Sequence, residues 1–267
     1  SRGLGVCIRD RIMNVTIIGC DGAYPRVNGA TSAYLVQDNE TKVLLDCGSG
    51  SISRLQNHIE LKELDGIVIS HYHADHYADL ECMQFATMLD TFEKKRENPL
   101  VIYGPGEEQM LTYKNFCKGN TFKGKESFTI GSLTFETKLN KHGIEAYSIK
   151  VTNEDGECLV YTGDTGYYDE LPVFCEEASL LIAESSCYEY ERGKLAGHMT
   201  GGEAGIVAEK SGVNTLILTH LPHYGDVEKM VDEAKQFFNG EVILARYDSC
   251  IDCLLYTSPS PRDPKTS

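Results

Sequence analysis

Residues 70–76 read Ser70-His71-Tyr72-His73-Ala74-Asp75-His76 and follow the buried, strand-like run that begins at Gly66. Imidazole and carboxylate are the ligands that borderline divalent metals prefer in proteins. The alternative is a solvated polar loop. However, the polar atoms of three histidines and an aspartate so close together cannot all find partners in an apolar core without a metal ion. The alternating His71 and His73 can bind one ion, while Asp75 and His76, past the turn, face a second. The stretch therefore predicts a two-metal centre.

Three further residues each follow a predicted strand and complete this centre: His142, Asp164 and His220. Taken alone, a single histidine is commonly a surface or core residue, and a carboxylate after a glycine turn is commonly a local cap. Beside a histidine pair that needs a third nitrogen, His142 becomes a ligand of the first ion. Asp164 can bridge two ions that lie about 3.5 to 4 Å apart. His220, at the mouth of a buried strand, completes the second site.

His198 lies in the segment Ala196-Gly197-His198-Met199-Thr200, just before a predicted helix. It is not needed to fill either coordination sphere, so we expect it to act in catalysis or in orienting the substrate. A histidine there can donate to a charged oxygen or protonate a leaving group; the alternative is a role at the helix entry. His58 is expected to be solvated on a surface helix, and His223 is left open between the surface and the rim of the pocket.

The core of the chain alternates short β-branched runs with helical stretches, without internal repeats. We predict strands at 15–20, 32–37, 42–46, 66–70, 99–103, 127–130, 133–139, 146–152, 158–162, 179–184, 215–219 and 242–245. Helices are predicted at 51–58, 77–90, 107–116, 202–210 and 227–238. A continuous sheet of about twelve strands would tend to curl or split, so two sheets packed face to face with helices outside are expected.

Residues 13–252 are predicted to form one domain of the α/β class, and residues 1–12 and 253–267 to be non-native or disordered ends. Residues 253–263 read CLLYTSPSPRD, which resembles a translated sequencing adapter. Without both ends, Lys plus Arg fall from 25 to 20 and Asp plus Glu from 40 to 38, a net charge of 20 − 38 = −18. Such a surface repels a long polyanion, so extended nucleic acid is not an expected partner.

The composition of the chain also indicates in which cellular compartment the protein is expected. No run of eighteen apolar residues and no secretory signal is visible, so no membrane partner is predicted and a cytoplasmic location is expected. Ten cysteines form no compact framework, and reduced thiols fit that compartment.

The order HxHxDH, then a separate His, an Asp and a last His, resembles the ligand order of the metallo-β-lactamase superfamily. The resemblance covers nearly all of residues 13–252 and implies a four-layer αββα sandwich with the metals at one edge of the paired sheets. It implies that His71, His73 and His142 bind the first metal, that Asp75, His76 and His220 bind the second, and that Asp164 is shared.

Within the superfamily the chain looks most like the ribonuclease Z branch and a group of small bacterial hydrolases. The residues that carry this likeness are Asp46-Cys47-Gly48-Ser49-Gly50, Ser70 to His76, Tyr161-Thr162-Gly163-Asp164, Gly197-His198-Met199-Thr200 and Leu218-Thr219-His220-Leu221-Pro222. His198 matches that branch's non-ligand histidine, which contacts the scissile phosphate. The chain departs from the branch in its acidity and in lacking a long Gly/Pro-rich arm. Dimers are common in the branch, so a homodimer is also implied, although no local segment identifies an interface.

The expected reaction is hydrolysis assisted by two divalent metal ions, with Asp75 orienting the attacking water and His198 acting from the opposite side. Zinc is expected for a nitrogen-rich site, with manganese and iron as alternatives. The expected substrate is a small phosphodiester, such as a cyclic nucleotide or a short RNA end, and the alternative is a thioester, lactone or other acyl compound. Two further classes stay open: a di-iron redox protein and a non-catalytic metal-binding module.

Overall fold

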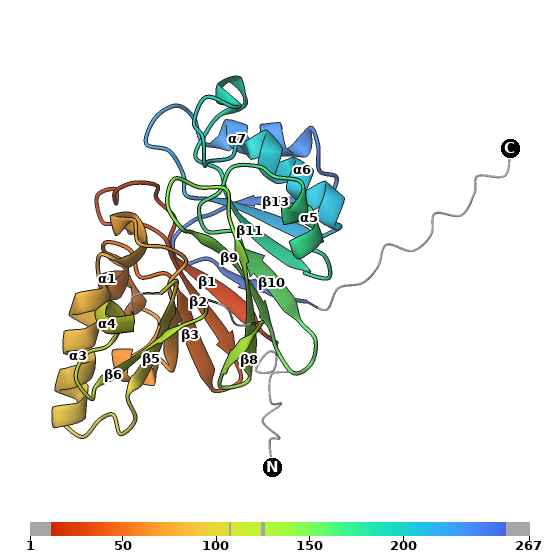
Figure 1. Cartoon of the computed structure of the whole chain (residues 1–267). Coiled ribbons are helices and arrows are strands. Elements are labelled where there is room, and N and C mark those ends of the chain that lie inside the picture. The colour runs from red at the N-terminus through yellow and green to blue at the C-terminus, as the bar shows by residue number, and fades with distance from the viewer. Residues whose placement is uncertain (1–11, 107, 124–125, 255–267) are drawn as a thin grey trace, which may run out of the picture.

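Two β-sheets face each other in the computed structural model, and helices cover the outer face of each (Figure 1). The structure describes residues 12–106, 108–123 and 126–254. Helices α1 (Ser51–Leu55), α3 (Leu80–Phe92) and α4 (Glu108–Leu111) flank the first sheet, and α5 (Glu170–Phe174), α6 (Gly201–Ser211) and α7 (Glu228–Lys235) flank the second. The described residues also form the short helix α2 (Ala74–Tyr77) and the 3-10 turns Leu61–Glu63 and Glu189–Glu191. The predicted αββα sandwich is confirmed.

Both sheets have seven strands and share one plan, with an antiparallel half joined to a parallel half. The first runs β14-β1-β2-β3-β4-β5-β6, and its members are β1 (Asn14–Gly19), β2 (Ala33–Asp38), β3 (Thr41–Leu45), β4 (Gly66–Val68), β5 (Leu100–Gly104), β6 (Cys117–Thr121) and β14 (Cys250–Asp252). Strands β3 to β6 are parallel, and the other neighbours are antiparallel.

The second sheet runs β13-β12-β11-β10-β9-β8-β7, with β10 to β13 parallel and the remaining neighbours antiparallel. Its members are β7 (Phe128–Ile130), β8 (Leu133–Leu139), β9 (Tyr147–Thr152), β10 (Cys158–Tyr161), β11 (Leu180–Glu184), β12 (Thr215–Thr219) and β13 (Glu241–Leu244). Three of the candidate ligands, His71, Asp164 and His220, come after the carboxyl ends of parallel strands.

Alternation along the strands builds two apolar layers. On β2, Tyr34 and Val36 point into the core between the sheets, whereas Leu35 joins the layer beneath α1 and α3. Successive side chains of a strand point to opposite faces, so a strand buried on both sides reads as a continuous apolar run. Burial of each such large side chain stabilises the fold by about 1.5 to 3 kcal/mol.

All twelve predicted strands are present, but two predicted helices differ. The predicted helix 77–90 is divided into α2 and α3, because the backbone of Asp79 donates to Cys47 O and its carboxylate accepts from the backbone of Ile52. The predicted helix 107–116 is reduced to α4. It cannot continue because Lys114 has a positive φ of 49°, and Tyr113 instead pairs with Cys117 in an isolated bridge.

The chain ends of the predicted domain meet at the edge of the first sheet. The backbone N–H of Cys253 donates to Met13 O at 2.7 Å, and Cys253 is buried. Residues 1–11 and 255–267 lie outside the described residues, so the expectation about the ends stays a prediction. The nine described cysteines are all free, including Cys250 and Cys253, which form a CxxC spacing. In the described ranges, no helix is long and apolar enough to cross a bilayer.

Candidate metal centre

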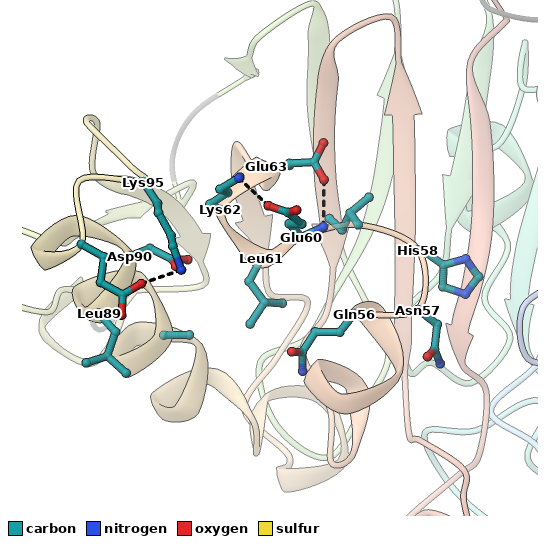
Figure 2. Close-up of a pocket in the computed structure, with 13 residues that line it drawn as sticks. Gln56, Asn57, His58, Glu60, Leu61, Lys62, Glu63, Leu89, Asp90 and Lys95 are labelled. Carbon is teal, nitrogen blue, oxygen red and sulfur yellow. Dashed lines mark hydrogen bonds and ion pairs between the residues drawn. The ribbon is translucent and has the colours of Figure 1, made fainter.

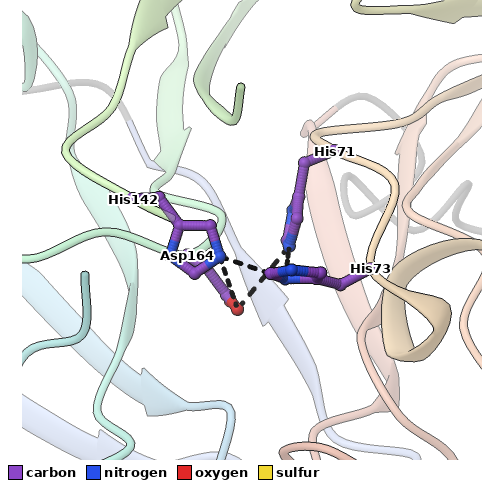
Figure 3. A group of neighbouring side chains, drawn as sticks. All are labelled: His71, His73, His142 and Asp164. Atoms are coloured by element: carbon purple, nitrogen blue, oxygen red, sulfur yellow. Dashed lines mark hydrogen bonds and ion pairs between the residues drawn. The ribbon is translucent and has the colours of Figure 1, made fainter. Parts of the chain in front are cut away.

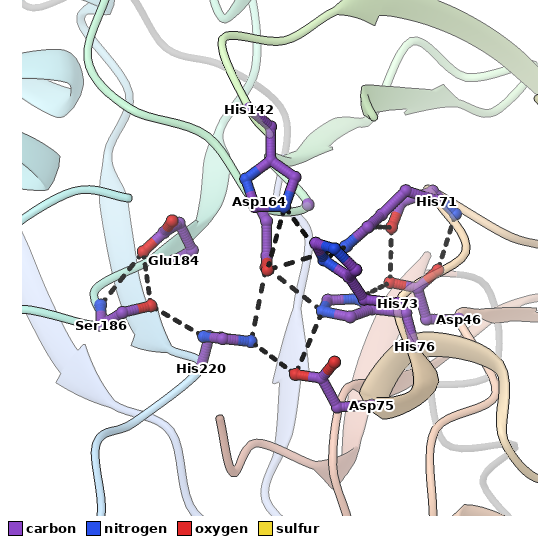
Figure 4. A network of polar contacts seen from close by, with 12 residues as sticks. Asp46, His71, His73, Asp75, His76, His142, Asp164, Glu184, Ser186 and His220 are labelled. Carbon is purple, nitrogen blue, oxygen red and sulfur yellow. Dashed lines mark hydrogen bonds and ion pairs between the residues drawn. The ribbon is translucent and has the colours of Figure 1, made fainter. Parts of the chain in front are cut away.

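The seven predicted ligands come from five separate segments and meet at one edge of the sandwich (Figure 4). His71 and His73 follow β4, Asp75 and His76 lie on α2, His142 lies between β8 and β9, Asp164 follows β10, and His220 follows β12. Carboxyl ends of parallel strands lie together at one edge of a sheet, which is where α/β proteins commonly bind ligands. The fold thus explains why residues up to 149 positions apart converge.

The first group contains three imidazoles and one carboxylate (Figure 3). The Nδ1 atom of His73 lies 3.1 Å from the Nε2 atoms of both His71 and His142. The Oδ2 atom of Asp164 lies 3.7 Å from His71 Nε2 and 4.0 Å from His142 Nε2. Two nitrogens that bind one zinc ion at about 2.1 Å in tetrahedral geometry are about 3.4 Å apart. The distances in the first group are therefore close to those expected when the four side chains bind one small cation.

The second group contains Asp75, His76 and His220, with the other oxygen of Asp164 beside it. His220 Nε2 lies 3.0 Å from Asp75 Oδ2, and His76 Nε2 lies 3.7 Å from the same oxygen. Asp164 Oδ1 lies 3.2 Å from His76 Nε2 and 3.5 Å from His220 Nε2. Asp164 therefore directs one oxygen to each group, as the bridging role predicts.

Two buried atoms of the second group test whether a cation fits. His76 Nε2 and Asp164 Oδ1 are buried and neither has a hydrogen-bond partner. A buried polar atom without a partner costs about 1 to 3 kcal/mol, so native proteins rarely leave one unsatisfied. A divalent ion between these atoms would satisfy both. The donor set, rich in imidazole nitrogen, suits zinc and related metals.

Electrostatics differ between the two groups. Burial lowers the pKa of His71 to about 2, with His76 adding to the effect, and burial also lowers the pKa of His73. These imidazoles are neutral, the form that binds metal. Burial opposes a charged His76, but Asp164 and Asp46 outweigh it and raise its pKa well above the ordinary value. The carboxylates that hold a proton there would equally favour a metal cation in its place.

Asp46 supports the centre from the end of β3 and was not predicted as a functional residue. Its Oδ2 atom lies 2.7 Å from His76 Nδ1, and it also accepts hydrogen bonds from the Tyr161 hydroxyl and from the backbone and hydroxyl of Ser70. Ser70 Oγ in turn lies 3.0 Å from His71 Nδ1. Partners of this kind fix the ring orientation of metal-binding histidines.

A second supporting pair, Glu184 and Ser186, lies on the opposite side (Figure 4). Ser186 Oγ is 2.7 Å from His220 Nδ1 and 2.8 Å from Glu184 Oε2. His142 Nδ1 is held separately by Gly197 O at 2.8 Å. Sequence reasoning missed Asp46, Glu184 and Ser186. The sequence offered one indication of the two carboxylates, because Asp46 and Glu184 each stand at the end of a buried apolar strand.

His198 lies beside the two groups, with its Nδ1 atom 2.9 Å from Glu184 Oε1. It also falls within a third group with Asp164 and His220, so its ring is close to the second site. Burial opposes its protonation, but the hydrogen bond and negative charge of Glu184 outweigh this and raise the pKa of His198 to about 9. The imidazole is therefore held as a cation near neutral pH.

The site opens into a cavity of about 630 Å³, lined by His73, Asp75, Asp164, His198 and His220 together with residues 22–24, 186, 195 and 222–224. His223 is among the lining residues, which places it on the rim. A larger cavity of about 830 Å³ lies beside α1 and α3 (Figure 2). It is lined mainly by polar side chains that pair with one another, such as Lys62 with Glu60. Among the described residues, the groups able to hold a metal all lie elsewhere.

His58 lines that second cavity and is exposed, as predicted, but it is not simply solvated. Its Nε2 atom lies 2.8 Å from Asp248 Oδ1, and Arg54 contacts the other oxygen of Asp248 at 2.6 Å. His58 thus belongs to a surface ion network that joins α1 to the segment after β13.

Facing mixed sheets with this histidine and carboxylate centre at one edge define the metallo-hydrolases of the metallo-β-lactamase fold. Residues 41–221 match the family described as "Beta-lactamase superfamily domain", and the chain belongs to that superfamily. A Bacillus subtilis protein named "Probable metallo-hydrolase YhfI" is 40% identical over 238 residues, covering 88% of this chain and 97% of that protein. The YhfI crystal structure matches with a TM-score of 0.87 at 39% identity, over 90% of this chain and 99% of that one.

Ribonuclease Z proteins are also among the relatives. The Methanopyrus kandleri ribonuclease Z is 25% identical over 276 residues, covering 89% of this chain and 96% of that protein. The short form of human tRNase Z has the same fold, with a TM-score of 0.72 at 22% identity over 91% of this chain and all of that one. These findings confirm the resemblance to the ribonuclease Z branch. Membership of a metallo-hydrolase family implies that the chain binds divalent metal.

Proposed function

We propose that the protein is a dinuclear metal-dependent phosphodiesterase that acts on a small phosphodiester or an RNA end. One observation carries this proposal: His198, paired with Glu184, faces the same cavity as both ligand groups without completing either. A protonated imidazole at that place is a donor for an anionic phosphoryl oxygen or for a departing alkoxide. The ribonuclease Z relatives support the same class of reaction.

The geometry of the two groups supports the following assignment of ligands. His71, His73 and His142 would hold one ion, Asp75, His76 and His220 the other, and Asp164 both. Bound divalent cations, expected to be zinc, would lower the pKa of a water molecule and neutralise charge on substrate oxygens.

The chain's own residues orient the reactants around that chemistry. Asp75 Oδ2 lies 3.0 Å from His220 Nε2 and accepts a hydrogen bond from the backbone N–H of Ala23, which leaves the other oxygen of Asp75 to orient an attacking water. His198, beside the second group, would bind the substrate and transfer its proton to the leaving oxygen, while Glu184 stabilises the imidazolium.

The charge of the whole chain supports a small substrate. A net charge of −15 repels an extended polyanion, whereas a single phosphodiester group carries only one negative charge. We therefore propose a small molecule or a short RNA end as the substrate.

The test is steady-state turnover of bis(p-nitrophenyl) phosphate and of p-nitrophenyl acyl esters by zinc-loaded protein, with and without a chelator. We expect chelator-sensitive turnover of the phosphodiester, and a loss of about 100-fold or more in kcat for His198→Ala with the bound metal unchanged. Turnover of acyl esters alone would show that the protein is an acyl hydrolase. Two bound metals without turnover of either substrate would instead favour a binding module, and bound iron with redox activity a di-iron protein.

A further inference from the structure

The rim of the metal cavity is apolar and aromatic. Tyr24, Leu195 and Tyr224 line it and are 59%, 50% and 46% exposed. Exposed large apolar side chains are unremarkable when scattered, but a group of them at a catalytic cavity marks a binding surface. These three side chains border the same space as His198 and Asp75.

Tyr24 is held there by a stack with His223. The two rings lie parallel, with an interplanar angle of 2° and centroids 3.7 Å apart. His223 Nε2 lies 2.9 Å from Gly22 O and 2.7 Å from Tyr24 O, so it donates its proton to the backbone that carries the tyrosine. One face of the Tyr24 ring is covered by His223, and no further ring stacks on Tyr24 among the described residues.

The loop that carries Tyr24 is fixed to the metal centre. Gly22 N donates to Leu221 O at 3.0 Å, and Leu221 N donates to Cys20 O at 2.8 Å. A Cβ on Gly22 would lie 3.0 Å from His220 Nδ1, so the loop and the proposed ligand are already in close contact. Ala23 N donates to Asp75 Oδ2 at 2.9 Å. Tyr24 is therefore preorganised at a fixed distance from the centre and does not belong to a free loop.

Charge limits what can occupy the rim. Among the described residues that line this cavity there is no lysine or arginine. A substrate with several phosphates would find no lysine or arginine there to neutralise the additional charge. The rim instead suits an uncharged, planar group attached to a singly charged phosphodiester.

We propose that Tyr24, backed by His223, forms a subsite that stacks on a planar aromatic group of the substrate, with Leu195 and Tyr224 bordering it. The proposal rests on the proposed phosphodiesterase function and adds the chemistry of the ester group. Offset stacking of aromatic rings contributes about 0.5 to 1.5 kcal/mol beyond burial, which corresponds to about 2- to 13-fold in affinity.

Two singly charged, phosphodiester-like ligands test the subsite: the monomethyl esters of phenylphosphonate and of cyclohexylphosphonate. They have the same charge and similar size, and only one has an aromatic ring. Calorimetric titration of zinc-loaded protein should show that the phenyl ligand binds about 3- to 10-fold more tightly. The preference should disappear in Tyr24→Leu, which keeps an apolar side chain, and persist in Tyr24→Phe.

Tyr190→Leu is the matched control, because Tyr190 is 68% exposed and does not line this cavity. An equal preference in Tyr24→Leu and in the unaltered protein, or no preference in either, would overturn the subsite. Binding is measured separately from turnover, so the two proposals can fail separately. A Tyr24-dependent preference without phosphodiester turnover would overturn the proposed reaction alone, and turnover without the preference would overturn the subsite alone.

Discussion

At the residue scale, the proposed metal centre depends on a carboxylate outside the ligand set. Asp46 is fully buried and contacts His76, Tyr161 and Ser70. A buried carboxylate is tolerated only when hydrogen bonds satisfy its oxygens, and this network holds the His76 ring in one orientation. The basicity and placement of His76 thus depend on a residue that would not contact the metal.

Asp46→Asn should therefore weaken metal binding. The amide keeps the shape but removes the charge that orients His76, and losses of supporting residues of this type typically cost 10- to 100-fold in metal affinity. Competitive titration with a chromophoric chelator measures the affinity. Asp38→Asn is the control, since Asp38 is also buried and bonded to Asn153 but lies outside the site. A similar affinity in both variants would contradict the prediction.

Glu184→Gln should change the pH dependence of turnover. The protonated form of His198 is the proposed donor, so activity is present below its pKa and is lost as pH rises through about 9. Without the carboxylate the pKa falls towards the ordinary value, and the loss should begin at lower pH. Profiles of kcat/KM against pH for Glu184→Gln and for Glu157→Gln, a buried glutamate away from the site, test this. An alkaline limb at the same pH in both variants would argue against His198 as the donor.

Residue identity alone predicts the centre unevenly. The run His71 to His76 is dense enough to indicate a metal site without any structure. His142, Asp164 and His220 have no such local pattern, and they become candidate ligands only because that run has already indicated a metal site. Asp46 and Glu184 could not be assigned, because a carboxylate at a strand end has many uses. Their roles depend on distances between elements that local sequence does not contain.

At the scale of elements, the loop after β3 holds α2 in place. Cys47 N donates to His76 O at 2.8 Å, and Gly48 packs so closely that a Cβ there would lie 2.2 Å from Asp75 O. Helix α2 has only four residues and cannot be stable by itself. The positions of Asp75 and His76 are therefore set by this contact.

Gly48→Ala should displace α2. The added methyl meets backbone oxygen, which cannot move aside, so we expect a loss of about 1 to 3 kcal/mol in the free energy of unfolding and weaker metal binding. Gly143→Ala is the control, because a Cβ there has nothing within 4 Å although the residue adjoins His142. Urea denaturation and metal titration of both variants give the comparison. Unchanged affinity in Gly48→Ala would show that α2 is positioned by other contacts.

Sequence patterns predicted the elements that have strong periodicity and missed those that depend on neighbours. Strand β6 reads Cys-Lys-Gly-Asn-Thr, which lacks apolar alternation, and it forms by pairing with β5 at the sheet edge. Strand β14 has three residues paired only with β1. Helix α5 is five residues long and contains Pro172. Each of these is fixed by tertiary contacts and not by local propensity.

At the scale of the whole molecule, the proposed ligands come from both halves of the sandwich. His71, His73, Asp75 and His76 belong to the first sheet and the helix after it, whereas His142, Asp164 and His220 belong to loops of the second. Each proposed ion would therefore have ligands from both sheets. Metal binding at this edge joins the two sheets across their interface, so it should stabilise the fold as a unit.

Metal should therefore raise the melting temperature of the protein. When the free metal concentration is one hundred times Kd, binding to the folded state adds about 2.7 kcal/mol per site to the free energy of unfolding. For a domain of this size, each kcal/mol raises Tm by about 2 to 4 °C, so one filled site should raise Tm by about 5 to 11 °C and two filled sites by about 11 to 22 °C. Calorimetry of chelated and zinc-loaded protein measures the shift. His220→Ala should show a smaller shift, whereas His58→Ala, which alters only the surface network with Asp248, should show the full shift. If zinc left Tm unchanged in the unaltered protein, the two sheets would not be joined by metal at this edge.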